Sequence, residues 1–213
     1  MAYRLVIFDF DGTLADTADW TIGIFNDMAR KHRFKTVSAD EIEMLRGKDN
    51  REIIAYLGVQ KWRLPFMARD MRRRVAAAAD EVRLFDGVPE LLRALEAAGI
   101  AIGMVSSNSE ANIRRALGPD ADRITYYGSG VSLFGKAGRL RKLARKAGVA
   151  PTDVICVGDE TRDIEAAKAA GLQSAAVTWG YMHEDVLRKW EPTVLVGTIP
   201  ELMRVFGLQP AGA

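Results

Sequence analysis

The sequence predicts an α/β fold, in which a doubly wound parallel sheet carries a small all-helical domain inserted after its first strand. Short apolar runs, rich in β-branched and aromatic residues, alternate with segments of helical spacing, as in a parallel sheet covered on both faces. Between residues 17 and 82 this alternation stops, and helical spacing continues without a strand-like run. A chain of 213 residues is long enough for such a sheet domain and a small insert.

Six apolar runs are predicted to be the strands of the sheet, because none shows the clean alternation of a half-exposed strand. They are RLVIF, IAIGMV, ITYYG, DVICVG, SAAVTW and TVLVG. Helical spacing is found in the segments VPELLRALEAAG, EANIRRALG, KAGRLRKLARKAG and TRDIEAAKAAG. Each of these segments closes on glycine, which commonly follows the last turn of a helix. The order of elements therefore indicates parallel strands joined by crossover helices.

The insert is predicted to be helical throughout. Its helical segments are TADWTIGIFNDMARKHRF, DNREIIAYLG and LPFMARDMRRRVAAAADEV. Asp49 or Asn50 is expected to cap the second segment, and Pro65 stands where the first turn of the third tolerates proline. The predicted domains are an α/β core of residues 1–16 and 83–213 and a helical cap of residues 17–82.

The composition is that of a globular protein without a polyanionic partner. Hydrophobic residues make up 48% and charged residues 27% of the chain, and its 30 basic and 28 acidic residues are interspersed, so we expect no nucleic-acid partner. No apolar run approaches the roughly 18 residues of a membrane span, and two acids interrupt the N-terminal apolar run. The single cysteine, Cys156, is expected to be buried and fits a reducing compartment. We therefore expect a cytoplasmic protein without a membrane partner, either a monomer or a dimer.

Polar residues follow several predicted strands, at the sheet edge where doubly wound folds bind ligands. In chain order these are Asp9 and Asp11 after RLVIF, Ser106, Ser107 and Asn108 after IAIGMV, Lys136 before a helix, and Asp159, Glu160 and Asp163 after DVICVG. Each has an ordinary explanation alone: acids cap turns, Ser-Ser-Asn can start a helix, and a lysine is usually solvated. Their order, each after the expected element, favours one shared site.

The four aspartates predict a metal site. At ~4 Å and an effective dielectric of ~20, each pair of like charges costs about 4 kcal/mol, so the cluster needs a cation. Oxygen-only ligands suit Mg²⁺, which often bridges to a phosphate. Ser106 and Lys136 can hold further phosphate oxygens, and Gly12 lets the backbone approach closely. Asp9 can then attack phosphorus, while Asp11 can act as acid and then as base.

At this point the sequence resembles the haloacid dehalogenase superfamily of phosphohydrolases. DFDGTLADT resembles the first motif of that family, and VGDETRD resembles the fourth, at Asp159 and Asp163. Ser106 and Lys136 match the looser second and third motifs. A helical insert directly after the first motif is similar to the cap of subfamily I, which includes phosphoglycolate phosphatases, sugar-phosphate phosphatases and β-phosphoglucomutases. The stretch AVTWGYMHEDVL also looks like the phosphoglycolate phosphatase branch.

The resemblance implies a Mg²⁺-dependent phosphatase that acts on a small phosphorylated metabolite through an aspartyl-phosphate. The implied catalytic residues are Asp9 as nucleophile, Asp11 as acid and base, Ser106 and Lys136. The implied metal ligands are Asp9, Asp11 through its backbone carbonyl, Asp159 and Asp163. Phosphate would be held by Ser106, Ser107, Lys136 and the amides near Gly12. The lysine lacks the proline that often follows it in relatives, and Glu160 could add a ligand or face solvent.

The identity of the substrate depends on the insert. Residues 17–80 contain thirteen Lys and Arg against nine Asp and Glu, and a basic cap over an acidic site suits a small anionic substrate. Arg46, in the stretch LRGK before a predicted helix, is the candidate to reach it.

Three other functions remain open. A β-phosphoglucomutase-like phosphomutase is opposed by Thr21, which stands where that branch has a hinge histidine. A phosphonate hydrolase would need a cap lysine to form a Schiff base. A catalytically silent binding protein is opposed by the intact pair of acids.

Overall fold

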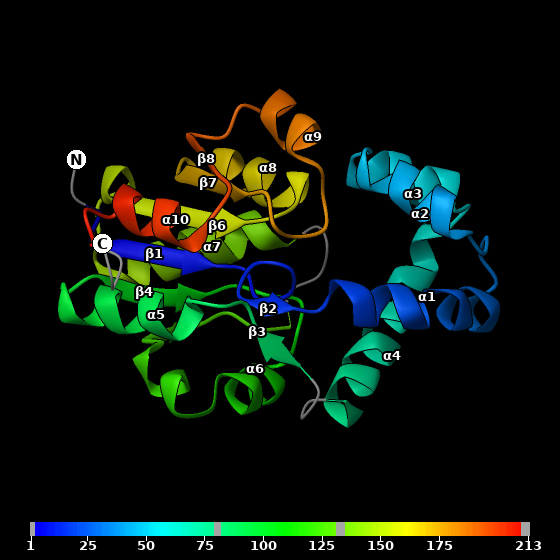
Figure 1. Ribbon diagram of the computed structural model, residues 1–213, viewed down its shortest axis with the longest axis horizontal. Helices are drawn as coiled ribbons and strands as arrows, with labels where there is room; N and C mark the ends of the chain where they lie inside the picture. Colours follow the sequence, from blue (N-terminus) through cyan, green and yellow to red (C-terminus); the bar gives the residue numbers. More distant parts are fainter. Residues whose placement is uncertain (1–2, 79–81, 131–134, 210–213) are drawn as a thin grey trace.

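The computed structural model describes residues 3–78, 82–130 and 135–209, which form a sheet layered between helices and a group of four helices beside it (Figure 1). The strands of the main sheet are β1 (Leu5–Phe8), β4 (Ala101–Met104), β5 (Tyr126–Tyr127), β6 (Val154–Gly158), β7 (Gln173–Val177) and β8 (Val194–Val196). Their order is β5-β4-β1-β6-β7-β8, and every neighbouring pair is parallel. The predicted doubly wound parallel sheet is thereby confirmed.

Helices cover both faces of the sheet. They are α5 (Val88–Ala97), α6 (Glu110–Leu117), α7 (Lys136–Ala147), α8 (Thr161–Ala170), α9 (Glu184–Lys189) and α10 (Ile199–Val205), with 3₁₀ turns η2 (Gly118–Arg123) and η3 (Pro151–Asp153). Because successive side chains of a strand point to opposite faces, Val6 and Phe8 pack with α5, α6 and α10, whereas Leu5 and Ile7 pack with α7 and α8. All four residues of β1 are buried, which explains the absence of alternation in its sequence.

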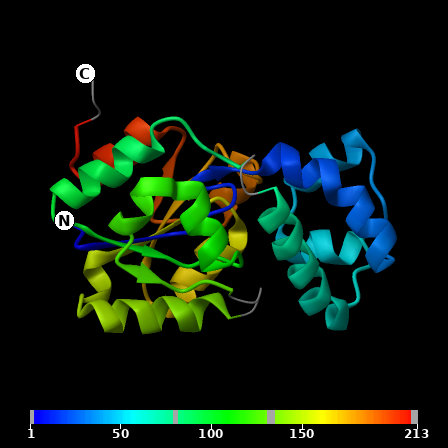
Figure 2. The ribbon, with the colours of Figure 1, turned by 90° about the horizontal axis from the view of Figure 1, so that it is seen from below.

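The insert consists of α1 (Ala18–His32), α2 (Ala39–Arg46), α3 (Asn50–Tyr56), η1 (Lys61–Arg63) and α4 (Leu64–Ala77), and both views place it beside the sheet domain (Figures 1 and 2). Asp49, one of the two predicted candidates, caps α3, and Pro65 stands in the first turn of α4. The helix α2 was not predicted, although Ser38 and Glu41 form a capping box at its start. None of these helices, nor any other in the described ranges, is long and apolar enough to cross a membrane.

A buried acid joins two helices of the insert. Asp70 on α4 accepts hydrogen bonds from Lys31, at 2.7 Å, and from Arg73, at 2.8 Å, and its other oxygen lies 3.1 Å from His32 Nε2. Arg74 Nε lies 3.7 Å from the same carboxylate. We refer to these five residues as the Asp70 cluster; it ties the end of α1 to the middle of α4.

A short antiparallel ladder joins the insert to the sheet domain. It consists of β2 (Ala15–Asp16) and β3 (Arg83–Leu84), which pair residue by residue. The chain enters the insert directly after β2 and runs from β3 into α5 (Figure 1). Each of these strands has two residues, one of which is charged, so no apolar run marks the ladder and the sequence did not predict it. The short helices α9 and α10 were missed as well.

Candidate active site

The carboxyl end of β1 positions the first acid. The N–H of Asp9 donates to the carbonyl of Val157 at 2.8 Å, so the ladder between β1 and β6 extends one residue beyond the strand. The Asp9 carboxylate is buried and accepts a hydrogen bond from the N–H of Phe10 at 2.8 Å. Asp9 is therefore held by sheet geometry rather than by a loop.

Three buried acids converge at this edge. Ligand oxygens of Asp9, Asp159 and Asp163 all lie within 4.8 Å of one another. Asp159 follows β6, and Asp163 lies in the first turn of α8. The donor set contains only carboxylate oxygens, which suits a hard divalent cation such as Mg²⁺. The structure thus brings together three of the four aspartates that the sequence predicted to form a metal site.

Lys136 lies between two of these acids. Its Nζ atom is 2.7 Å from Asp9 Oδ2 and 2.6 Å from Asp163 Oδ1. Burial by itself would raise the pKa of Asp9, but the nearby charges of Lys136 and Arg162 outweigh it and hold that pKa below its usual value. Burial would likewise lower the pKa of Lys136, but the charges of Asp163 and Asp9 raise it above its usual value. Asp9 is therefore ionised and faces a cation.

Arg162, a second cation of the site, was not predicted from the sequence. It stands in the first turn of α8, with Nη2 at 2.5 Å from Glu160 Oε1 and 3.9 Å from Asp9 Oδ2. Its Nε atom is buried and makes no hydrogen bond. The stretch DETRD resembles an ordinary solvated helix start. The direction of the Arg162 side chain could therefore not be predicted from the sequence.

Glycines allow Asp159 to sit deep in the site. Its two oxygens accept hydrogen bonds from Thr13 Oγ1 and from the N–H of Tyr181, both at 2.8 Å. A Cβ atom at Gly12 or at Gly180 would lie only 2.3 Å from Asp159 Oδ2. Gly12 also has a φ of +76°, which side chains rarely adopt. Gly12 thus acts here through close packing of the acid, and Gly180 does the same from the loop after β7.

Asp11 is placed to exchange a proton. It is half-buried, two residues beyond Asp9, and accepts long hydrogen bonds from Asn108 Nδ2 at 3.3 and 3.4 Å. Burial and the negative charge of Asp9 raise the pKa of Asp11 to about 7. Ser109 caps α6, so the alternative explanation of Asn108 as the helix cap does not hold.

The predicted phosphate-binding residues lie at the same edge. Ser106 is buried directly after β4 and Val105, and its Oγ accepts the N–H of Asn108 at 3.0 Å. Ser107 lines a cavity between the insert and the sheet domain, and its carbonyl accepts a bond from Arg72 Nη1 at 3.4 Å.

Arg46 reaches the cavity but stands outside the acid cluster. Its guanidinium donates to the carbonyl of Tyr181 at 3.0 Å and to that of Gly180 at 3.4 Å. It therefore binds the loop that follows β7, and it lines the cavity from there.

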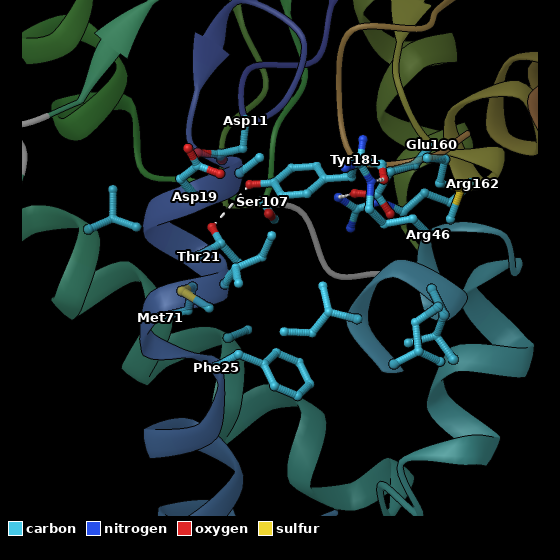
Figure 3. Close-up of a pocket in the computed structure, with 18 of the residues that line it drawn as sticks. Asp11, Asp19, Thr21, Phe25, Arg46, Met71, Ser107, Glu160, Arg162 and Tyr181 are labelled. Carbon is cyan, nitrogen blue, oxygen red and sulfur yellow. Dashed lines mark hydrogen bonds and ion pairs between the residues drawn. The ribbon is translucent and has the colours of Figure 1, made fainter. Parts of the chain in front are cut away.

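Polar contacts hold the insert against the sheet domain. The hydroxyl of Tyr181 lies 2.8 Å from that of Thr17. It also lies 3.0 Å from the hydroxyl of Thr21, a contact that Figure 3 shows. Asn50 donates to Glu160 at 2.5 Å and accepts from Thr161 at 3.0 Å. Glu160, whose role the sequence left open, thus pairs with Arg162 and with the insert. Tyr181 was not predicted, because an aromatic residue in TWGY is usually a core residue.

The cavity has a volume of about 350 Å³ and opens from Asp11 into the insert (Figure 3). The sheet domain contributes Asp11, Ser107, Asn108, Glu160, Arg162, Tyr181 and Met182 to its lining. Side chains of α1, α2, α3 and α4, with Val37 from the segment before α2, form the remainder. Groups at the acid cluster can therefore act on one end of a molecule whose other end lies among the helices.

Comparison with known proteins agrees with this geometry. Residues 6–177 match the family model of haloacid dehalogenase-like hydrolases. The chain is 32% identical over 203 residues to a phosphoglycolate phosphatase of Synechococcus elongatus, across 94% of this chain and 96% of the relative. It is 31% identical over 219 residues to an N-acetylmuramic acid 6-phosphate phosphatase of Pseudomonas aeruginosa, across 96% of this chain and 95% of the relative. The crystal structure of a predicted phosphatase from Clostridium acetobutylicum shares the fold, with a TM-score of 0.80 and 21% identity over 98% of this chain and 100% of that one.

Proposed function

The chain belongs to the haloacid dehalogenase-like hydrolase family, and from this premise we propose that it is a Mg²⁺-dependent phosphatase of small phosphate monoesters, with phosphoglycolate-like esters and sugar phosphates as the first candidates. One observation carries the proposal. Asp9, ionised and fixed at the end of β1, lies beside the acid pair Asp159 and Asp163 and the cation Lys136. Asp11, whose pKa is near neutrality, stands two residues away.

The donor set fits Mg²⁺, and Asp9, Asp159 and Asp163 would hold it together with the backbone carbonyl of Asp11. When bound, Mg²⁺ would neutralise charge on the phosphate and orient it. The residues themselves do the rest. Lys136 and Ser106 bind phosphate oxygens, and the neighbouring cation Arg162 adds positive charge.

The proposed reaction has two steps, both carried out by the acids after β1. An oxygen of Asp9 attacks phosphorus, the bond from phosphorus to the ester oxygen breaks, and Asp11 gives its proton to the departing alcohol. Asp11, now ionised, takes a proton from a water molecule, which attacks the aspartyl-phosphate and releases inorganic phosphate. A pKa near 7 allows Asp11 to serve in both directions.

Details of the site weigh against the alternatives. No lysine is found among the described residues that line the cavity, which disfavours a phosphonate hydrolase with a Schiff-base lysine. Thr21, at the position of the hinge histidine of phosphomutases, bonds to Tyr181 instead. The buried acids and the cation beside them disfavour a silent binding protein. The single buried cysteine supports a reducing compartment, and we propose a cytoplasmic enzyme.

The test is phosphate release from 2-phosphoglycolate, hexose phosphates, nucleotides and pyrophosphate, with and without Mg²⁺. We expect release that needs Mg²⁺, is abolished in Asp9→Asn and is strongly slowed in Asp11→Asn. Asp185→Asn, a surface change on α9, is the matched control and should leave turnover unchanged. Activity retained by Asp9→Asn would contradict the assignment of the nucleophile, and formation of an isomerised sugar phosphate would favour a mutase.

A further inference from the structure

The cavity beside Asp11 changes character along its length. At the mouth the sheet domain supplies carboxylates, an amide, hydroxyl groups and the guanidinium of Arg162, which pairs with Glu160. Inside the insert the lining is mainly apolar and is drawn from all four helices: Ile22, Phe25, Leu45, Ile53, Met71 and Val75. Among the labelled residues, Phe25 lies at the end opposite Asp11 (Figure 3). A molecule that presents phosphate to Asp9 would therefore place its other end among hydrocarbon side chains.

Five cations of the insert are engaged with acids away from this cavity. Lys31, Arg73 and Arg74 bind the carboxylate of Asp70. Lys35 pairs with Glu41, and Lys48 lies 3.7 Å from Glu52. These five cations thus lie on acids of the insert and not on the cavity, so the excess of basic residues in the insert does not by itself make the cavity basic.

The two arginines of the insert that line the cavity are bound at its rim. Arg46 donates to the carbonyls of Gly180 and Tyr181, and Arg72 donates to the carbonyl of Ser107. The exposed acid Asp19 also lines the cavity near Asp11 (Figure 3). A negative charge at this point repels a second anionic group on a substrate. The interior beyond the rim therefore offers little that could bind a carboxylate or a row of sugar hydroxyls.

From this lining, and on the basis of the proposed phosphatase activity, we infer that the preferred substrates are phosphate monoesters whose alcohol has an apolar aliphatic or aromatic body, ahead of the phosphoglycolate-like esters and sugar phosphates named as first candidates from the comparisons. A cavity of about 350 Å³ is large enough for such a group, since ligand sites typically span about 300–1,000 Å³. Burying hydrocarbon against these side chains favours binding, whereas hydroxyl groups without partners would lose their hydrogen bonds to water. The insert thus selects for the leaving group and the sheet domain for the phosphate.

Binding of alkylphosphonates tests the inference independently of turnover, because their P–C bond is not hydrolysed as an ester. Dissociation constants of ethyl- and hexylphosphonate are measured by titration calorimetry on the full chain with Mg²⁺. We expect hexylphosphonate to bind about tenfold more tightly or better, with a more negative heat-capacity change. Equal affinities, or tighter binding of 3-phosphonopropanoate than of butylphosphonate, would overturn the inference.

A pair of variants on α4 locates the effect. Met71 lines the cavity, and Met67, one helical turn earlier, does not. Met71→Gln keeps the shape of the side chain but adds an amide, and it should cut the ratio of hexyl to ethyl affinity severalfold. Met67→Gln should leave that ratio unchanged. If both variants changed the affinity ratio equally, or if neither changed it, the alkyl chain would not lie in the cavity.

Hydrolysis separates this inference from the proposed function. Simple n-alkyl phosphates have leaving groups of nearly equal acidity, so the dependence of kcat/KM on chain length reports binding of the alkyl group. A rise of about tenfold or more from ethyl to hexyl phosphate supports both proposals. If phosphate release depends on Asp9 but kcat/KM does not change with chain length, the inference is overturned and the proposed function stands. Length-dependent phosphonate binding without any phosphate release overturns the proposed function alone.

Discussion

Replacing Lys136 with methionine tests the electrostatic account of the site most directly. The substitution keeps the length and the apolar stem of the side chain but removes the charge between Asp9 and Asp163. In the native chain the lysine Nζ atom lies 2.7 and 2.6 Å from their carboxylates, and its side chain is only 13% exposed. The variant leaves two buried acids without their nearest partner.

The expected cost follows from the loss of one partner of a buried ion pair, which is about 3–5 kcal/mol. For a chain of this length that corresponds to a fall in Tm of about 6–20 °C. The cost should depend on pH, because Lys136 lowers the pKa of Asp9, and without it burial, which raises that pKa, is opposed mainly by Arg162. An acid whose pKa is raised in the folded state destabilises the fold while it is ionised, at high pH. The destabilisation decreases as the pH falls and the acid becomes protonated. The loss should therefore be larger at pH 8 than at pH 5.5.

Urea unfolding at both pH values, without Mg²⁺, measures the free energy of unfolding. Lys142→Met, an exposed substitution on the same helix α7, is the control and should change stability by less than about 0.5 kcal/mol. A Lys136→Met variant within about 1 kcal/mol of the native protein at pH 8 would refute the reasoning. So would a loss that does not shrink at pH 5.5.

Three further predictions address the remaining parts of the structure. Gly180→Ala places a Cβ atom 2.3 Å from Asp159 Oδ2 and should displace that carboxylate. We therefore expect the rate of phosphate release at saturating Mg²⁺ to fall about 100-fold or more. An unchanged rate would show that the loop after β7 moves to accommodate the methyl group. Asp70→Asn should lower the free energy of unfolding by about 1–3 kcal/mol at pH 7. Hydrogen bonds from Lys31 and the other cations of the Asp70 cluster hold the pKa of Asp70 well below its usual range. The stability that the ionised Asp70 contributes is therefore present above about pH 4 and is lost below it. Thermal melts at pH 7, 5 and 3 should show the Tm values of the native protein and of Asp70→Asn converging in acid. Asn108→Ala removes a hydrogen bond that lowers the pKa of Asp11. In the pH profile of kcat/KM, the fall on the alkaline side should therefore move above its native position near pH 7. A fall at the same pH would argue against Asp11 as the acid.

The fold was largely predictable because its main elements are long enough to carry a pattern. Each of the six strands appears as an apolar run. The C-cap residue of each helix from α5 to α8 is a glycine, or in α5 the alanine directly before a glycine. What was missed is short: the two-residue strands β2 and β3, and the helices α9 and α10. The helix α2 is a different case, since Ser38 and Glu41 have the spacing of a capping box and could have been recognised.

The site was predictable where a residue follows a strand directly. Asp9, Asp159 and Asp163 owe their positions to β1, β6 and the turn into α8, and strand order alone brings them together. Arg162 and Tyr181 could not be found in the same way. Their positions depend on side-chain direction within a helical turn and on the path of the loop after β7, and neither leaves a periodic signal in one sequence. The apolar interior of the insert was equally hidden, because the sequence shows its charges but not how they pair.

The β2–β3 ladder has a consequence for how such a protein can change. The chain leaves for the insert and returns from it at two paired residues, Asp16 and Arg83, so its two covalent connections to the sheet domain lie side by side. An insert with neighbouring ends can be exchanged, lengthened or reshaped without shifting the strands that carry the acids. Selection could therefore alter the alcohol that is recognised while the groups that cleave the ester stay in place. A grafted insert, joined at the same two residues, would carry its preference with it into a foreign sheet domain.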